Sequence, residues 1–316
     1  MSNAITLWTH YRPECFYLCL ESLRKCRGIE KHPIYIPINA DSDYEIPLIA
    51  KKLLDGLDYK IIVRPPGWFC ERANGEALKE GLRRSDDYTV LLSEDEEVSA
   101  DILELFDYVN EHFKSEKLMS VSTSGILLPR PYKPGDEKLL VISGRFQGRT
   151  LAIWKEPFEK YAKKYFCEEF YQSEIVEPYT GKRFNDAQFM LREFPGTGRT
   201  LIGSIWGVDG LLQRVITKNE LQTLTTVIPR SHEIGFCGVH VNTDPHVRAN
   251  LLGELPLEER VNKMREIIKT GEIKQMFGFW SYHYFPLESD HKWDELIRMD
   301  VVIVKEEVMK ETKASG

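Results

Sequence analysis

The sequence of 316 residues carries a formal net charge of −7, and 42% of its residues are hydrophobic. This composition is ordinary for a globular protein and excludes an intrinsically disordered or collagen-like chain. The negative charge leaves no excess of Lys and Arg to neutralise phosphates, so we expect no nucleic acid partner. No run approaches the roughly 20 apolar residues of a membrane-spanning helix, and no secretion signal is recognisable, so we predict a cytoplasmic protein without an integral membrane segment.

The first ninety residues alternate between apolar strands and amphipathic helices. We predict strands at 5–10, 32–43, 59–66 and 87–97, and helices at 12–26, 46–57 and 73–85. A further helix, at 101–114, follows the fourth strand. Strands that alternate with helices of this length indicate a largely parallel sheet covered by helices. Ligands of such sheets bind beyond the carboxyl ends of the strands.

The C-terminal part differs from this pattern. The stretch "PLEERVNKMREIIKTG" predicts an amphipathic helix at 256–271, with Leu257, Val261, Met264 and Ile268 on one side. We therefore divide the chain into a main domain at 1–245 and a C-terminal helical extension at 246–316. The six cysteines form no C-x-x-C pair, which favours reduced thiols. The oligomeric state is left open.

Polar residues follow three of the predicted strands. They are Thr9 to Arg12, Asn39 to Asp41, and Ser93 to Glu97, the last in the stretch "TVLLSEDEEVSAD". We expect these segments to face one crevice, because the carboxyl ends of parallel strands lie at the same edge of a sheet. Carboxylate oxygens are the ligands that Mg²⁺ and Mn²⁺ prefer, so the acidic turn is a candidate metal site. The alternative is a solvated acidic turn on the surface.

A family resemblance supports the first interpretation. The run "VLLSEDEEVSADILELF" resembles the strand and acidic motif of GT-A-fold glycosyltransferases, particularly the group of the Golgi N-acetylglucosaminyltransferase I and its bacterial relatives. The N-terminal "THYRPECFYLCLESL" is similar to the first strand and helix of that family. The segment from Gly148 to Trp154, the stretch "IWGVDGLLQ" and the stretch "IPRSHEIGFCGVH" match later family motifs in the correct order. Together these matches span roughly residues 5 to 242.

The resemblance implies an α/β fold of the GT-A, Rossmann-like type, with a mixed, mostly parallel sheet flanked by helices. It also implies a metal-dependent, inverting transfer of a hexose or N-acetylhexosamine. The donor would be a nucleoside diphosphate sugar, with UDP-sugars favoured, and the acceptor a carbohydrate or another hydroxyl group. The expected cofactor is Mn²⁺ or Mg²⁺.

The acidic motif of the family assigns roles to three consecutive residues. Asp95 matches the carboxylate that binds the metal, and Glu94 takes the place of the residue that reaches the ribose. Ser93 replaces the first acidic residue of the motif. These two departures leave Asp95 as the closest match to the family pattern.

The later motifs supply the remaining roles that the resemblance implies. Asp209 matches the general base, which accepts the proton of the acceptor hydroxyl group. Its alternative role is to cap the helix that follows. Arg230 and His240 lie in the loop that closes over the donor, where either would contact the diphosphate. His240 would alternatively be a second metal ligand or an ordinary hydrogen-bonding residue at the surface.

Further residues are candidates for binding the donor. They are Thr9, His10 and Arg12 after the first strand, Asp41 after the second, and Asn74 before the acidic turn. Asp41 would accept a hydrogen bond from a uracil imide, or would instead cap the next segment. Trp154 and Trp206 would stack on a sugar face, or would instead pack in the core.

Two other functions remain open at this point. A nucleotidyltransferase would share the sheet and the acidic site, but "WTHYRPEC" lacks the glycine-rich phosphate loop typical of that class. A non-catalytic nucleotide- or glycan-binding module of the same fold is the second alternative, because Ser93 and Glu94 depart from the family motif.

Overall fold

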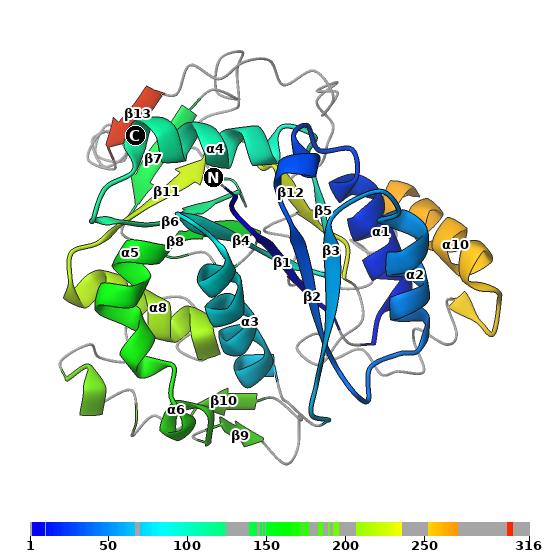
Figure 1. Ribbon diagram of the computed structural model, residues 1–316, viewed down its shortest axis with the longest axis horizontal. Helices are drawn as coiled ribbons and strands as arrows, with labels where there is room; N and C mark the ends of the chain where they lie inside the picture. Colours follow the sequence, from blue (N-terminus) through cyan, green and yellow to red (C-terminus); the bar gives the residue numbers. More distant parts are fainter. Residues whose placement is uncertain are drawn as a thin grey trace, which may run out of the picture.

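The computed structural model describes residues 2–9, 11–66, 70–123, 125, 139–143, 146, 148, 150–172, 174–176, 183–185, 189, 192–195, 207–235, 252–270 and 302–305. Within these ranges, nine strands form one sheet in the order β13-β7-β11-β6-β8-β4-β1-β2-β3 (Figure 1). They are β1 (Ile5–Trp8), β2 (Ile34–Asn39), β3 (Tyr59–Arg64), β4 (Tyr88–Ser93), β6 (Leu118–Ser122), β7 (Leu139–Ser143), β8 (Leu151–Trp154), β11 (Gln222–Thr226) and β13 (Val302–Lys305). Two small ladders join β5 (Glu96–Val98) to β12 (Ser231–Glu233) and β9 (Glu174–Val176) to β10 (Arg183–Asn185).

The sheet is mixed and mostly parallel. Strands β3, β2, β1 and β4 run parallel to one another, as do the pairs β6 with β11 and β7 with β13. Strand β8 is antiparallel to β4 and β6, and β7 is antiparallel to β11. This topology, with helices on both faces, confirms the predicted α/β fold class, a mixed and mostly parallel sheet flanked by helices. The strands β6, β7, β8 and β11 come from the middle of the chain, which the sequence pattern did not resolve into elements.

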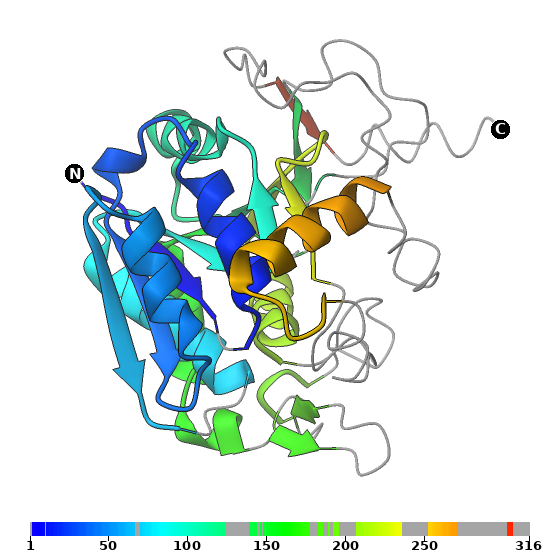
Figure 2. The ribbon, with the colours of Figure 1, turned by 90° about the vertical axis from the view of Figure 1, so that its right-hand side faces the viewer.

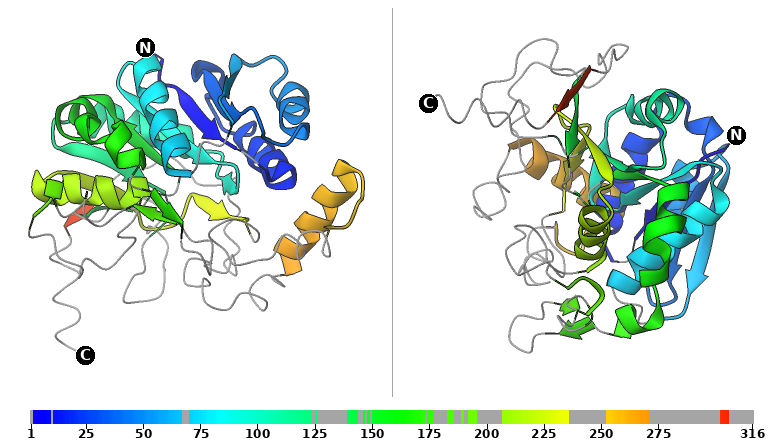
Figure 3. Two further views of the ribbon diagram at one scale, coloured as in Figure 1. Left: turned by 90° about the horizontal axis from the view of Figure 1, so that it is seen from below. Right: turned by 90° about the vertical axis from the view of Figure 1, so that its left-hand side faces the viewer.

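The helices lie on both faces of the sheet. Their bounds are α1 (Pro13–Leu23), α2 (Glu45–Leu53), α3 (Cys70–Arg84), α4 (Ile102–Phe113), α5 (Lys155–Pro157), α6 (Glu168–Gln172), α8 (Gly207–Lys218) and α10 (Leu257–Thr270). Short turns η1 (Ile29–Lys31), η3 (Phe158–Ala162) and η4 (Lys163–Tyr165) complete the described elements. Figure 3 gives two further views of this layered arrangement.

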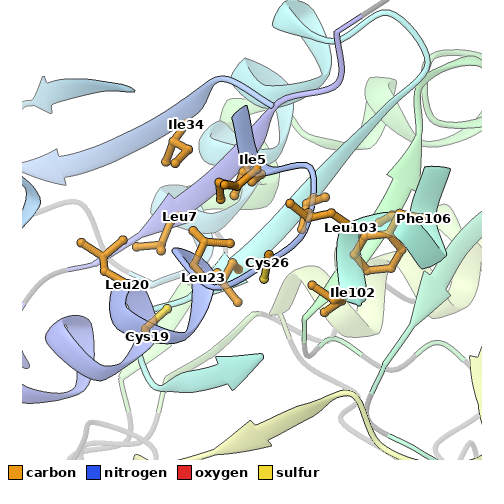
Figure 4. Packing of buried hydrophobic residues seen from close by; sticks show 14 of the residues in the cluster. Ile5, Leu7, Cys19, Leu20, Leu23, Cys26, Ile34, Ile102, Leu103 and Phe106 are labelled. Atoms are coloured by element: carbon orange, nitrogen blue, oxygen red, sulfur yellow. The ribbon is translucent and has the colours of Figure 1, made fainter. Parts of the chain in front are cut away.

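One hydrophobic core joins α1, α2 and α4 to the sheet. Helix α1 begins at Pro13, a residue suited to the first helical turn, and buries Phe16, Cys19, Leu20 and Leu23. Figure 4 shows Cys19, Leu20 and Leu23 of this helix beside Ile5 and Leu7 of β1, in one cluster with the α4 residues Ile102, Leu103 and Phe106. A second core, on α3, α8 and residues 158–171, covers the other face. Both faces of β1 and β4 are therefore covered, whereas the edge strand β3 is partly exposed. The carboxyl ends of these parallel strands are the expected place for a site.

The described C-terminal elements contact the main part of the fold. Helix α10 packs on α1 (Figure 2), and its Val261, Met264 and Ile267 share a buried cluster with Leu18 and Ile234. Strand β13 pairs with β7 at the edge of the large sheet. The division of the chain at residue 245 stays a prediction. Among the described helices, none combines the length and the apolar character needed to cross a lipid bilayer.

Candidate functional site

The site lies where β1, β2 and β4 end. These strands are parallel, and Trp8 at the end of β1 is the register partner of Ser93 at the end of β4. The residues that follow β1 and β4 therefore lie side by side, as the sequence predicted. Polar side chains here belong to short loops held by three buried strands.

Five of the predicted site residues form one hydrogen-bonded network. The hydroxyl of Thr9 donates to Oε2 of Glu94, and Nε of Arg12 donates to Oε1 of the same carboxylate at 2.7 Å. The second arm of the guanidinium, Nη1 of Arg12, lies 2.9 Å from Oδ2 of Asp95. The hydroxyl of Ser93 donates to Oδ1 of Asp95 at 2.5 Å. The end of β1 is thus connected to the acidic turn by charged hydrogen bonds.

Arg12 is the cation of this network. Its side chain is 17% exposed, and burial by itself would lower the pKa of its guanidinium. The carboxylates of Asp95 and Glu94 outweigh burial and raise that pKa well above its ordinary value. The guanidinium is therefore a permanent positive charge between two carboxylates.

The acidic turn is not a solvated surface loop. Glu94 is 2% exposed and Glu96 is 3% exposed. Oε2 of Glu96 accepts a hydrogen bond from the backbone N–H of Thr150 at 2.7 Å. The alternative of an ordinary wet turn is wrong for these two residues, because buried carboxylates need the partners that Arg12, Thr9 and Thr150 provide.

A second segment lies against the acidic turn. Strands β5 and β12 are antiparallel, with Glu96 opposite Glu233 and Val98 opposite Ser231. The ladder continues where the backbone N–H of Ile234 donates to the carbonyl of Asp95 at 2.7 Å. Gly235 follows, and a Cβ added there would stand 2.5 Å from Oδ2 of Asp95. The described start of the "IPRSHEIGFCGVH" segment therefore covers the acidic turn directly.

Asp209 lies in the first turn of α8, where a carboxylate interacts favourably with the helix dipole. A Cβ added at Gly148 would stand 2.1 Å from both carboxylate oxygens of Asp209. Two residues later, Thr150 contacts Glu96. Gly148 and Thr150 are separated by two peptide units. The carboxylates of Glu96 and Asp209 therefore lie at most about 13 Å apart. Gly148 and Thr150 therefore connect the acidic turn to the predicted base.

The other predicted donor-binding residues differ in their placement. Asp41, after β2, is exposed, and one of its carboxylate oxygens lies 3.4 Å from the hydroxyl of Tyr11, which precedes Arg12. Asn74 is half-buried in the first part of α3. Arg230 is placed differently from our expectation. It is fully buried, and its Nε donates to Oδ2 of Asp101 at 3.0 Å, so it holds two loops together in the interior.

Trp154 packs in the core. Its side chain is 1% exposed, its indole N–H donates to Oδ1 of Asn110, and its ring stacks on Tyr88 with centroids 5.2 Å apart. Contact with a sugar is therefore excluded for Trp154. Of its two predicted roles, packing in the core is correct. The predicted residues His10, His240 and Trp206 lie outside the described residues.

Three residues at the site had no assigned role before the structure. They are Glu96, Gly148 and Gly235. Gly148 and Gly235 could have been found from the sequence, because each lies in a segment that matches a motif of the family. Glycine in such a motif permits another group to approach the backbone closely. No signal distinguished the buried Glu96 from its half-buried neighbours Asp95 and Glu97, because its burial depends on Thr150, which is distant in sequence.

The donor set at the acidic turn fits a cation. Carboxylate oxygens of adjacent residues are suitable ligands for a hard divalent ion, and a guanidinium already lies against both Glu94 and Asp95. Within the described ranges, no group of three His, Cys, Asp or Glu side chains converges as a complete metal-binding set. Asp95 would hold a divalent ion here together with ligands from a bound nucleotide or water.

The fold and site define a mixed α/β protein with a cluster of paired charged side chains at the carboxyl ends of its parallel strands. No protein-family model matches the sequence, and no curated protein matches it. Structural similarity is found to residues 1–349 of TarS from S. aureus in complex with UDP, at 10% identity and a TM-score of 0.45, covering 92% of this chain and 76% of that one. The same region in complex with UDP-GlcNAc has 11% identity and a TM-score of 0.43, over 89% and 74% of the two chains.

A third similar structure is the mannosyltransferase PcManGT from Pyrobaculum calidifontis in complex with GDP-Man and Mn²⁺. It shows 15% identity and a TM-score of 0.38, over 51% of this chain and 46% of that one. All three TM-scores are below 0.5, so we infer no property of this chain from them.

Proposed function

We propose that this protein is a glycosyltransferase that uses a nucleoside diphosphate sugar, with a UDP-sugar as the favoured donor. The observation that carries the proposal is that Thr150 contacts Glu96 of the acidic turn while Gly148 lies against Asp209. It supports a site in which a charged turn that could hold a diphosphate and a carboxylate that could accept a proton lie at most about 13 Å apart.

In the proposed reaction, the acceptor hydroxyl group attacks the anomeric carbon of the donor. Its proton passes to the carboxylate of Asp209, and the nucleoside diphosphate leaves on the opposite face with the bonding electrons. This in-line geometry inverts the anomeric centre. A hexose and an N-acetylhexosamine are both compatible with this chemistry, as are carbohydrate and other hydroxyl acceptors.

The diphosphate requires positive charge, because the turn itself carries Glu94, Asp95, Glu96 and Glu97. Asp95 would hold Mn²⁺ or Mg²⁺, with His240 as a further candidate ligand. When bound, such an ion neutralises the charge that develops on the leaving diphosphate. The residues of the chain itself orient the site: Thr9 and Arg12 fix Glu94, and Ser93 fixes Asp95.

Binding and turnover can be tested separately. A thermal-shift panel of UDP, GDP, CDP and dTDP, with and without Mn²⁺, should show the largest rise in melting temperature with UDP and Mn²⁺, because a ligand of the folded state stabilises it. Hydrolysis or transfer of UDP-sugars then reports turnover. Binding without any turnover would identify a non-catalytic module, and no response to any nucleotide would refute the proposal.

A further inference from the structure

Both oxygens of the Asp95 carboxylate already have partners within the chain. Oδ1 accepts the hydroxyl of Ser93 at 2.5 Å, and Oδ2 lies 2.9 Å from Nη1 of Arg12. The side chain of Asp95 is only 16% exposed. A metal ion bound by this carboxylate would need an oxygen that is now engaged by a hydroxyl or by a guanidinium.

The space next to this ion pair is also restricted. A Cβ added at Gly235 would stand 2.5 Å from Oδ2 of Asp95 and 2.8 Å from Nη1 of Arg12. The backbone of Gly235 therefore covers the Oδ2 side of the pair. A divalent ion, which keeps several oxygen ligands around it, has no room at Oδ2 while Nη1 stays in place.

The Arg12 guanidinium has two arms with different partners. Its Nε donates to Glu94, which is almost fully buried, and its Nη1 contacts Asp95. Rotation about the contact with Glu94 would release Asp95 without leaving Glu94 uncompensated. Like charges repel, so the guanidinium and a divalent ion cannot share Oδ2 at contact distance.

We propose that Arg12 and a divalent cation compete for Asp95, so that the cation reaches Oδ2 only when Nη1 of Arg12 leaves that oxygen. The use of a divalent cation in this site rests on the proposed function. The competition itself concerns only the chain and the ion. Arg12 is then a positioning residue that holds the Asp95 carboxylate until a cation replaces it.

The test measures Mn²⁺ binding to the full chain without nucleotide, by the loss of the electron paramagnetic resonance signal of the free ion. Arg12→Gln removes the competing charge, so the Mn²⁺ dissociation constant of this variant should fall about tenfold or more relative to the original protein. A change of this size corresponds to the free energy of one charged hydrogen bond. Arg27→Gln is the control for loss of one positive charge: Arg27 forms an exposed pair with Glu104 away from the site, and this variant should bind Mn²⁺ like the original protein. The gain should disappear in Arg12→Gln combined with Asp95→Asn.

A second measurement uses the unchanged protein and does not depend on the folding of a variant. The side-chain ¹⁵Nε–¹Hε signal of Arg12, assigned by its absence in Arg12→Lys, should shift on titration with Mg²⁺ as Nη1 leaves Asp95. The inference is overturned if Arg12→Gln binds Mn²⁺ no tighter than the original protein, or if its gain survives Asp95→Asn. It is also overturned if saturating Mg²⁺ leaves the Arg12 signal unchanged.

These outcomes are independent of the glycosyltransferase proposal. A chain that turns over UDP-sugars but shows no competition retains the proposed function and loses this inference. A chain that shows the competition but binds no nucleotide retains this inference and loses the proposed function.

Discussion

A methyl group at Gly148 would stand 2.1 Å from both carboxylate oxygens of Asp209. The absence of a side chain at Gly148 is therefore what lets Asp209 occupy its position. Because the colliding atoms are the end of a short side chain, Gly148→Ala should displace the carboxylate and leave the backbone in place. We expect turnover of a UDP-sugar to fall by about tenfold or more, since small misplacement of a reacting group is costly. The free energy of unfolding should change by less than about 1 kcal/mol.

The control for this prediction is the same change in a background of Asp209→Ala. There the methyl group meets no carboxylate, so Gly148→Ala should have no further effect on activity. A displaced Asp209 with full activity would show that its position does not matter for turnover.

Asp209→Asn keeps the shape of the side chain and removes its capacity to accept a proton. If Asp209 is the general base, the rate of transfer should fall by about 10² to 10⁴. The rise in melting temperature caused by UDP should stay the same, because the change does not affect the acidic turn. Equal rates for the variant and the original protein in a transfer assay would exclude the assigned role.

Glu96 should act as a structural acceptor for the backbone of Thr150. Glu96→Gln retains a carbonyl oxygen at the same reach and should leave the free energy of unfolding nearly unchanged. Glu96→Ala leaves the Thr150 N–H buried without this acceptor and should cost about 1 to 3 kcal/mol. Urea unfolding of the two variants provides the comparison. An equal loss for both would mean that charge, and not hydrogen bonding, is what the site requires.

Arg260 joins the C-terminal helix to the main fold. Its Nε lies 2.5 Å from Oε1 of Glu14, which is 1% exposed, and its Nη2 donates to Glu45. Arg260→Ala would leave the buried carboxylate of Glu14 without this cation, so we expect a loss of about 3 kcal/mol in the free energy of unfolding. Lys263→Ala, on the exposed side of the same helix, is the control and should have little effect. Adding Glu14→Gln should restore part of the loss, and failure to do so would contradict this account.

The lowered pKa of Asp107 predicts that the free energy of unfolding falls at low pH. Burial would raise the pKa of its carboxyl, but His32, whose Nε2 lies 3.4 Å from Oδ2, and the hydrogen bond from Tyr88 outweigh burial and lower that pKa below its ordinary value. The stability that Asp107 contributes is therefore present above the unfolded pKa, at about pH 4, and is lost as the pH falls through the folded pKa. Urea unfolding between pH 6 and pH 3 should show a steeper loss for the original protein than for Asp107→Asn. Parallel curves would exclude this contribution.

Much of the fold was predictable from the chain order of strands and helices. The periodicity of residues 5–114 gave β1 to β4 and α1 to α4, because each of these elements buries a regular apolar face. The short strands β6, β7, β8 and β11 lacked this signal. They lie in the middle of the sheet or pair with partners distant in sequence, so long-range contacts and not local patterns decide their structure.

The sequence by itself determined that polar side chains follow β1, β2 and β4, since a strand ends where its apolar residues end. It also determined that parallel strands bring these residues to one edge. Only the tertiary structure decided which of them are buried, which pair with one another, and which leave the site. Arg230 joins the interior and Arg12 joins the acidic turn, and this difference depends on contacts with Asp101, Glu94 and Asp95 that no local pattern specifies. The physical reason is that a buried charge is stable only beside its partner, and chain folding alone decides where that partner lies.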